Sequence, residues 1–554
     1  MTDRSSGSQP SLFHAMLGHL GLLFRLERKI VGLIVSYSVA IGLFALIIPL
    51  TVQELVNTFA YAIQPITIIT LAGIMIVALT LVGAFKALQY YAVEMLERRI
   101  FTRTAIAMTK QLTTFDFAPF QSRYANYFME TIWLQRALSV LLVDLVNVLI
   151  GGAVGMTILV FYHPYFLVYN TLLVVGFSIV FFVLPYGGLR TTIEMSHVKY
   201  EMLHWIQEIS KNLLHAKVTD SQALLMQRTD QVAEEYITAR QARFAILMRQ
   251  YLGSVGGQAI AHTGVLATAG WLLSIGELTL GQLVAAEVVV TGLLIDFDSV
   301  IKHMGHVYYF LTALVKLDTF FSLPRDHSPV ATSVSLPDPT IHGLRVTCKT
   351  LSVVHGGVQV FESFDLEATP GERIGIYAPT IVAKTSLARI LAGLDVPTSG
   401  IVRYNDIDLR HLDLDVINRH RGFMLDSYLS LFEGTIEDNI VLGRTYVPYQ
   451  DLHWALRFTE LAEEIDMLPL GIKTEVQSLG NVLAPSLLLR ILLARTIVAR
   501  PQLLIFEGIL HDMEPTIRET IMRRICDKEE PWSVIFVSND PNLTPHIDRR
   551  LILH

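Results

Sequence analysis

The chain has 554 residues, of which 52% are hydrophobic and only 17% are charged. One hydrophobic core rarely serves a chain of this length, and the composition is too apolar for an ordinary soluble protein, so we expect several domains and a membrane-embedded part. The formal net charge of −7 argues against nucleic acid as a partner, because phosphate recognition needs a basic surface.

The first segment predicts a helix that lies on a membrane surface. Apolar side chains such as Leu12 and Phe13 mix there with basic ones such as Arg25 and Arg28. This mixture is typical of an amphipathic helix at the interface between lipid and water. We therefore assign residues 1–29 to an N-terminal amphipathic helix.

Six apolar stretches follow, each close to the roughly 20 residues that a helix needs to cross a bilayer. We expect the spans near residues 30–52, 66–84, 138–160, 166–186, 251–275 and 280–301. The short links inside the pairs one–two, three–four and five–six carry no Lys or Arg, whereas the two long connections between pairs carry many. Because cytoplasmic loops are enriched in Lys and Arg, both long connections and both termini are predicted to be cytoplasmic. The transmembrane domain is assigned to residues 30–321.

The sixth span carries two acidic residues, Glu287 and Asp298, eleven positions apart and so on nearly one helical face. One interpretation is a polar patch that lines a path for substrate or ions. The other is local pairing, of Asp298 with Lys302 four residues on and of Glu287 with a neighbouring helix. We favour local pairing, and Asp144 in the third span is interpreted in the same way.

Residues 322–342 are rich in Pro and Ser and predict a linker. From Gly343 to the C-terminus, short apolar runs such as RIGIYA, QLLIFEG and SVIFVSN alternate with helical patterns. This alternation predicts an α/β domain with a largely parallel sheet over residues 343–554. Its two cysteines, Cys348 and Cys526, cannot form a disulfide framework, which fits a cytoplasmic location.

Four segments of this second domain carry a family resemblance. They are PGERIGIYAPTIVAKTSLARILAGLDVPTSGIVRYNDIDL, LSLFEGTIEDNI, LPLGIKTEVQSLGNVLAPS and LARTIVARPQLLIFEG, in this order. The domain resembles the nucleotide-binding domain of ABC transporters, and the whole layout resembles an exporter half-transporter. The resemblance implies an all-α domain of six transmembrane helices joined to an α/β domain of the P-loop NTPase type. It further implies short coupling helices, with RYANYFMETIW and ISKNLLHAKV as candidates.

The phosphate loop departs from the family pattern GxxxxGK(S/T), whose glycines let backbone N–H groups curl around phosphates. Ala378 and Ala383 replace the two framing glycines, and Ile381 replaces a central one. An added Cβ penalises positive φ, and a branched side chain crowds the cradle. Lys384 and Thr385 are retained, followed by Ser386. They could hold phosphate and Mg²⁺ weakly; the alternative is a solvated lysine at a helix start.

The resemblance assigns the residues of hydrolysis to altered positions. Glu507 stands where the family has a magnesium-linked Asp, and Gly508 stands where it has the general-base Glu. For Glu507 we weigh a weak contact with the metal against a strand-end carboxylate that faces solvent, and we favour the latter. Asn539 replaces the switch histidine. Losing a positioned general base costs on the order of 10²–10⁴ in rate.

Two further positions of the binding site differ from the family. Ser427 falls on the glutamine of the Q-loop, and His355 falls on the residue that stacks on adenine. The signature loop, which completes the partner's site in a dimer, reads Leu483, Ala484, Pro485, Ser486 and Leu487. Ala484 lacks the serine hydroxyl and Pro485 lacks an N–H, so this loop cannot grip a γ-phosphate in the usual way.

These substitutions predict the membrane subunit of a dimeric exporter with weak or absent binding of ATP and Mg²⁺ and very low hydrolysis. A homodimer and a heterodimer with an intact half-transporter both stay open, as does an envelope adaptor protein. The substrate is not predicted, and the expected location is a bacterial inner membrane. The competing interpretation is a structural or regulatory membrane protein that transports nothing. A third interpretation is ordinary ATP-driven transport despite the altered motifs.

Overall fold

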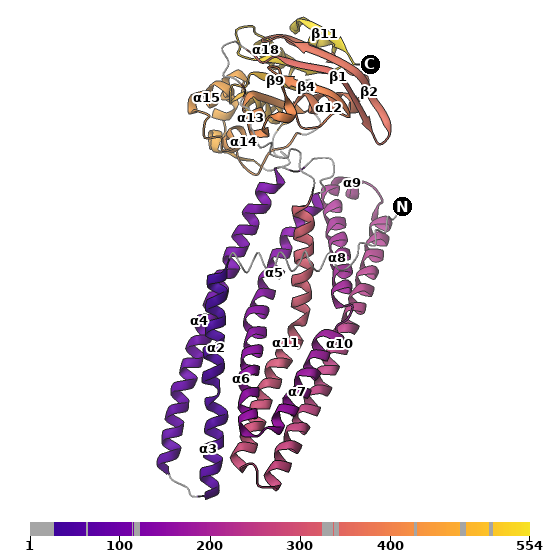
Figure 1. The fold of residues 1–554 in the computed structure, drawn as a ribbon. Coiled ribbons are helices and arrows are strands. Elements are labelled where there is room, and N and C mark those ends of the chain that lie inside the picture. Colours follow the sequence, from indigo (N-terminus) through magenta and orange to yellow (C-terminus); the bar gives the residue numbers. More distant parts are fainter. Residues whose placement is uncertain are drawn as a thin grey trace. The chain divides into compact units, whose positions relative to one another are not determined.

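The computed structural model describes residues 27–61, 65–113, 115, 122–323, 336, 343–425, 429–476, 484–508 and 513–553. The chain divides into two compact units, Met1–Pro324 and Arg325–His554, the first helical and the second mixed α/β (Figure 1). Residues 1–26 of the predicted amphipathic helix and most of the predicted linker lie outside the described residues, and Arg28 and Lys29, which were assigned to that helix, instead begin the first helix of the transmembrane domain.

The N-terminal unit consists of long helices, in agreement with the predicted all-α membrane domain. Some are broken by short 3₁₀ or π segments, which mark local changes in helical winding. The elements are α2 (Arg28–Ala45), α3 (Ile47–Tyr61), α4 (Pro65–Leu112), η1 (Ser122–Met129), α5 (Glu130–Ser139), η2 (Val140–Leu145), α6 (Val146–Tyr162), α7 (Tyr165–Ser178), η3 (Ile179–Val183), α8 (Gly188–Lys211), α9 (Leu213–Val218), α10 (Gln222–Ser274) and α11 (Leu280–Phe321).

Four helical segments of the described chain are long and apolar enough to cross a membrane. They are Arg28–Phe59, Pro65–Leu112, Tyr124–Tyr162 and Tyr165–Lys211, and they contain the first four predicted spans. The last two predicted spans fall within α10 and α11, which are not among these four. All six predicted spans nevertheless coincide with long helices of the described chain, and α10 and α11 also carry polar side chains that contact one another.

The two acidic side chains of α11 that the sequence singled out are paired. Asp298 lies 2.5 Å from Lys302 one turn on and accepts a hydrogen bond of 3.2 Å from Gln258 of α10. Glu287 lies 2.8 Å from the Nδ1 atom of His262, also on α10. The predicted local pairing of Glu287 and Asp298 is thereby confirmed. Asp144 of η2 is similarly placed, 3.6 Å from His303.

Helix α11 is the centre of the N-terminal unit (Figure 1). It packs against α3, α5, α6, α8 and α10 and buries side chains along its whole length. At its start the Thr279 side chain accepts a hydrogen bond from the Gln282 N–H, and the Gln282 side-chain oxygen accepts one from the Thr279 N–H. This reciprocal cap satisfies backbone donors that would otherwise lack partners. Beside it, the Gly281 N–H donates to Asn57 Oδ1 of α3 at 3.1 Å.

The C-terminal unit contains a five-stranded parallel sheet, as the alternating pattern predicted. Its order is β11-β3-β10-β9-β6, with bounds β3 (Arg373–Tyr377), β6 (Arg421–Leu425), β9 (Leu503–Glu507), β10 (Ser533–Val537) and β11 (Arg549–Ile552). A four-stranded antiparallel sheet has the order β2-β1-β4-β5, with β1 (Val346–His355), β2 (Val358–Ala368), β4 (Ser399–Tyr404) and β5 (Ile407–Asp408). A small pair joins β7 (Gly434–Thr435) and β8 (Glu475–Val476).

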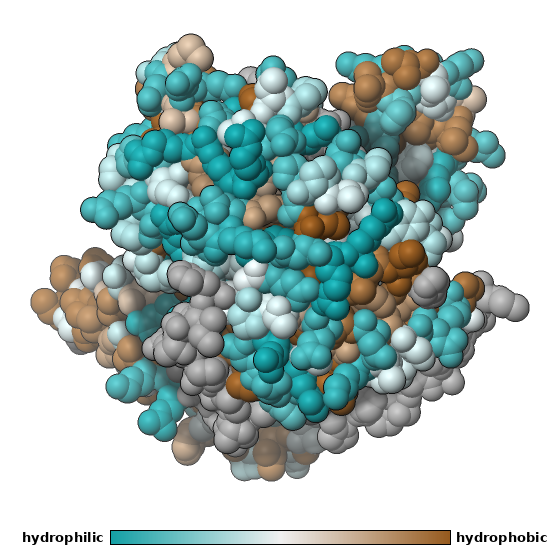
Figure 2. All heavy atoms as spheres, turned by 90° about the horizontal axis from the view of Figure 1, so that it is seen from above, coloured by the Kyte–Doolittle hydropathy of each residue, from teal (hydrophilic) through white to brown (hydrophobic). Residues whose placement is uncertain are grey.

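Helices cover both faces of the parallel sheet, so its central strands read as continuous apolar runs. Leu503 and Ile505 of β9 face the core that includes α12, whereas Leu504 and Phe506 face the core that includes α17. The helical elements are α12 (Ile381–Leu391), η4 (Leu409–His411), α13 (Leu414–His420), α14 (Ile436–Val441), α15 (Tyr449–Phe458), α16 (Ala462–Asp466), η5 (Gly471–Lys473), α17 (Pro485–Ile497), α18 (Pro515–Ile525) and η6 (Pro541–His546). The surface of this unit is mostly hydrophilic in the view of Figure 2.

The close contact of α3 with α11 generates a prediction. A Cβ added at Gly281 would clash with the carbonyl oxygen of Gln53 and the side chain of Asn57. We expect Gly281→Ala to lower the free energy of unfolding by about 1–3 kcal/mol, the usual cost of overpacking. Thermal unfolding of the purified chain in detergent measures the effect.

Gly292→Ala is the matched control, because a Cβ there meets nothing within 4 Å on the same helix. This variant should be neutral or slightly stabilising, since alanine favours a helix over glycine. Equal melting temperatures for the two variants would contradict the close packing at Gly281.

Candidate functional site

The carboxyl ends of three neighbouring parallel strands, β3, β9 and β10, meet beside the start of α12. Open α/β sheets bind ligands at this edge. A cavity of 340 Å³ lies here, lined by Thr380, Ile381, Lys384, Gly508, Ser538, Asn539, Asp540 and Pro541. The fold thus brings together four residues that the sequence predicted, namely Ile381, Lys384, Gly508 and Asn539.

Residues 378–385 lead from strand β3 into a helix. Helix α12 begins at Ile381, three residues before Lys384, and none of residues 378–385 has a positive φ. The Thr380 side chain accepts a hydrogen bond of 3.1 Å from the Ala383 N–H, and the Thr380 carbonyl accepts one of 3.0 Å from the Lys384 N–H. Thr380 therefore caps α12 in the ordinary way for a helix N-terminus.

A third backbone donor of the loop is also engaged. The Ala378 N–H donates to Asn539 Oδ1 at 3.0 Å. Backbone N–H groups in these positions are what a phosphate loop directs at its ligand. In this chain three of them are satisfied by oxygens of the protein itself, while the Ile381 side chain is 76% exposed.

Glu507 is buried at the end of β9, with only 1% of its surface exposed. Its carboxylate accepts a hydrogen bond from the Thr385 hydroxyl and lies 4.0 Å from the Lys384 ammonium. The favoured interpretation from sequence, a carboxylate that faces solvent, is therefore wrong. A buried carboxylate is costly unless it is paired and hydrogen-bonded, and the residues of the phosphate loop supply both interactions.

The oxygens of Thr385 and Glu507 are of the type that Mg²⁺ prefers. Across the described part of the chain, however, no group of three or more His, Cys, Asp or Glu could hold a metal ion. Mg²⁺ is commonly bound by one or two carboxylates together with substrate phosphates. The donor set therefore fits Mg²⁺ only if phosphate oxygens complete its coordination.

Gly508 follows Glu507 in a conformation that suits glycine. Its φ is +80°, a region that other L-residues rarely adopt. Its N–H donates to the Val537 carbonyl at 2.9 Å, which continues the contact between β9 and β10 beyond the strands. The backbone at Gly508 is thus fixed by the sheet.

The remaining predicted residues lie elsewhere or outside the described chain. His355 ends β1 beside the Gly356–Gly357 turn, is exposed, and does not line the cavity. Ser386 lies within α12, next to Thr385. Ser427 and Leu483 lie outside the described residues.

The described part of the predicted signature loop begins a helix. Ala484 precedes α17 and makes no side-chain cap, and Pro485 is the first helical residue. Proline suits this position because its missing N–H would have no partner inside the helix. The Leu487 N–H donates to the Ala484 carbonyl at 2.9 Å, and the Ser486 carbonyl accepts from Arg490.

Sequence reasoning missed Thr380 as a functional element of the loop. The available signal was a threonine directly before an apolar helical run, the usual pattern of an N-cap. It was hidden because the segment aligns with a glycine-rich loop. Ser538 and Asp540 of the cavity wall were also missed, since only their neighbour Asn539 had a counterpart in the family pattern.

Curated relatives match the chain at low identity. The sulfate/thiosulfate import ATP-binding protein CysA of Escherichia coli strain K12 is 26% identical over 204 residues, 36% of this chain and 54% of CysA. Human mitochondrial ABCB7, an iron-sulfur clusters transporter, is 23% identical over 336 residues, 59% of this chain and 43% of ABCB7. The mycobactin import ATP-binding/permease protein IrtB of Mycolicibacterium thermoresistibile is 23% identical over 312 residues, 55% of this chain and 52% of IrtB.

The chain spans about half the length of these curated relatives. No family model matches it. Among solved structures, that of a bacterial Atm1-family ABC exporter with ATP bound superimposes with a TM-score of 0.84 and 18% identity, over 96% of this chain and 94% of the exporter. The likeness of fold therefore extends over both units.

The cap on α12 generates a prediction for this site. Thr380→Val keeps the shape of the side chain and its extended backbone but removes the oxygen that the Ala383 N–H needs. We expect the free energy of unfolding to fall by about 1 kcal/mol, the typical value of an N-cap. Thermal unfolding of the full chain measures it.

Thr520→Val is the control, because Thr520 is a partly exposed residue in the interior of α18 and its hydroxyl donates to the Thr516 carbonyl one turn earlier. Its effect should stay within about 0.5 kcal/mol. If Thr380→Val proves as mild as this control, Thr380 does not hold the loop in its helical form.

Proposed function

We propose that the chain is the membrane subunit of a dimeric ABC exporter whose own nucleotide-binding domain hydrolyses ATP very slowly or not at all. The proposal is supported by the similarity to ABC transporter proteins and by the likeness of fold to an ABC exporter over both units. The transmembrane domain spans residues 30–321 and the nucleotide-binding domain residues 343–554. The substrate stays open.

The observation that carries the proposal is the end of strand β9. Gly508 has no proton acceptor where the family places its general base, and its backbone is held by Val537. Asn539, at the position of the switch histidine, has no positive charge, and its side-chain oxygen accepts from the Ala378 N–H. Water activation therefore lacks its base, which by itself removes on the order of 10²–10⁴ in rate.

The state of the phosphate loop adds a second obstacle, to nucleotide binding. Lys384 and Thr385 are the side chains that would hold phosphate and, with Glu507, Mg²⁺. In the structure these two residues already contact Glu507, and the N–H groups of Ala383 and Lys384 are bonded to Thr380. ATP has to replace these internal contacts, so binding is weak or absent.

Dimerisation does not repair the defect. Each site of the family is completed by the partner's signature loop, and in this chain Ala484 lacks a hydroxyl and Pro485 lacks an N–H. A homodimer would have two inactive sites, and an intact partner would still leave each site without one functional face. Any energy for transport would then have to come from the phosphate-binding residues of an intact partner subunit, working opposite the altered signature loop of this chain.

The cellular setting follows from the charge pattern. Lys and Arg gather in the two long connections, which supports a cytoplasmic location for these and for both termini. The protein would then be a multi-pass protein of a bacterial cytoplasmic membrane, with or without an envelope adaptor. The short helix α9 exposes Leu213, Leu214 and Val218 and falls within the predicted second coupling segment.

The first prediction concerns hydrolysis. Purified full-length protein in lipid nanodiscs should release phosphate from MgATP at the same rate as its Lys384→Ala variant, because neither has a general base. Phosphate release is measured beside an intact ABC exporter prepared identically, which controls for the assay. A wild-type rate clearly above that of Lys384→Ala would refute the impaired site.

The second prediction concerns binding. Glu507→Gln keeps an acceptor for Thr385 but removes the charge that faces Lys384, so the ammonium becomes available to phosphate. We expect affinity for a fluorescent ATP analogue, measured without Mg²⁺, to rise on the order of fivefold, equivalent to about 1 kcal/mol for a partly exposed ion pair.

Two variants control this experiment. Glu437→Gln changes a carboxylate of α14 that does not line the cavity, and it should leave affinity unchanged. The double variant Lys384→Ala/Glu507→Gln should lose the gain. Unchanged or reduced affinity in Glu507→Gln alone would show that Glu507 does not compete with nucleotide.

A further inference from the structure

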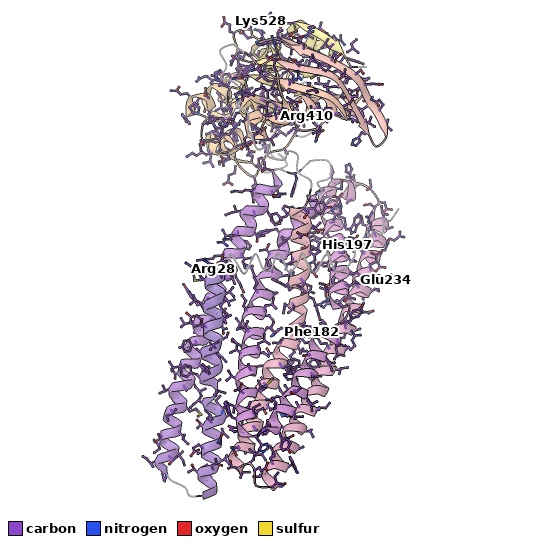
Figure 3. The ribbon with its side chains drawn as sticks, in the orientation of Figure 1. Arg28, Phe182, His197, Glu234, Arg410 and Lys528 are labelled. Atoms are coloured by element: carbon purple, nitrogen blue, oxygen red, sulfur yellow. The ribbon has the colours of Figure 1, made fainter. Side chains whose placement is uncertain are left out.

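A charged cluster is buried in the N-terminal unit where α5, α8 and α11 come together. It comprises Glu130 of α5, Ser196, Lys199 and Tyr200 of α8, and Lys316 of α11. His197, labelled in Figure 3, marks the stretch of α8 that contributes. The Glu130 side chain is fully buried and that of Lys316 is 10% exposed.

The contacts in the cluster converge on one carboxylate oxygen. Glu130 Oε1 lies 3.2 Å from the Lys199 ammonium and 3.6 Å from the Lys316 ammonium, and it accepts a hydrogen bond of 3.3 Å from the Ser196 hydroxyl. Lys316 donates to the Ser196 hydroxyl at 2.7 Å and to the Ser196 carbonyl at 3.2 Å. A single residue of α11 is thereby tied to both other helices.

Aromatic rings close the cluster. The Lys316 ammonium lies 3.7 Å from the centre of the Tyr200 ring and 5.2 Å from that of Tyr127 in η1. Such contacts favour the charged form of the lysine, and they are strongest when water is excluded. From α10, Arg243 lies over the Tyr309 ring and donates to Thr192 and to the Gly305 carbonyl, so its charge is engaged on neighbouring turns.

The charges of the cluster do not balance. One carboxylate faces two ammonium groups, so the cluster carries a surplus positive charge when all three groups are ionised. A buried charge without its own partner is costly, and in practice the group gives up its charge. The Lys199 side chain is 35% exposed, whereas that of Lys316 is only 10% exposed. Lys316 is therefore the group that releases the proton.

The electrostatic surroundings of Lys316 support this assignment. Burial lowers the pKa of Lys316 to about 7, with Lys199 acting in the same direction and Glu130 opposing them. An ordinary lysine side chain has a pKa near 10.4 and stays charged at all physiological pH values. Lys316 therefore changes its charge within the range of physiological pH.

We propose that the Glu130–Lys199–Lys316 cluster is a proton-controlled latch, in which release of the Lys316 proton tightens α11 against α5 and α8 and its return loosens them. Helix α11 ends at Phe321, five residues after Lys316, and leads to the segment before the C-terminal unit. The latch thus acts on the last turns of the helix that connects the two units along the chain. It does not depend on the proposed exporter function.

The sign of the pH effect follows from the direction of the shift. The folded chain binds the Lys316 proton less tightly than the unfolded chain, so the penalty for burying the charge is fully present below about pH 7. It is relieved as pH rises from about 7 towards 10.4, with up to tenfold in the local opening equilibrium per pH unit. The packed state of the three helices is accordingly favoured by alkaline conditions.

Hydrogen exchange on the full chain in nanodiscs, between pH 6 and pH 8.5 and corrected for intrinsic exchange, tests the latch. Backbone protection of α5, α8 and the last turns of α11 should rise by about three- to tenfold per pH unit above pH 7. Lys316→Met cannot titrate and should show a flat profile. Lys316→Arg keeps its charge and should stay at low protection throughout.

Two more variants make the outcome decisive even if Lys316→Met folds poorly. Lys199→Met removes the surplus charge, so Lys316 keeps its proton beside Glu130 and protection should be high and flat. Lys302→Met, which removes a half-exposed ion pair on the same helix, should retain the wild-type profile. A flat wild-type profile, or a wild-type slope preserved in Lys199→Met, would overturn the proposal.

Discussion

A charge withdrawn from water has to be paired or given up, and this constraint governs each functional region of the chain. At the edge of the parallel sheet Glu507 is held by Lys384 and Thr385. In the helical unit Glu130 is shared by two lysines, and Glu287 is matched by His262. In each place the partner lies on a different element, so the pair forms only when those elements pack against each other.

The nucleotide-binding fold illustrates what such pairing does to a site. In working relatives the cation and hydroxyl of the phosphate loop are satisfied by nucleotide and metal. In this chain the protein satisfies them, with Glu507 for the side chains and with Thr380 and Asn539 for backbone donors. The side chains of Lys384 and Thr385 and three backbone donors of the loop thereby have partners within the domain itself.

The architecture was readable from sequence because it depends on local and repeated signals. Runs such as QLLIFEG and SVIFVSN predicted buried parallel strands, and the uneven spacing of apolar stretches predicted the helical layout. The pairing of Asp298 with Lys302 was predictable from a spacing of one turn. The burial and pairing of Glu507 were not predictable, because its partner Thr385 is 122 residues away and only the fold of the sheet brings the two together. The start of α12 at Ile381 was not predicted, because the segment was aligned with a glycine-rich loop. The surplus positive charge at Lys316 was not predictable either, because it arises only when α5, α8 and α11 pack together.

The positive φ of Gly508 has a consequence for how this chain can change over time. A carboxylate introduced at this position by a single substitution would start from a backbone that penalises any side chain. The Gly508 N–H is bonded to the Val537 carbonyl, so the backbone cannot change its conformation there without straining that contact. Glycine is therefore strongly preferred at the end of β9 on conformational grounds alone.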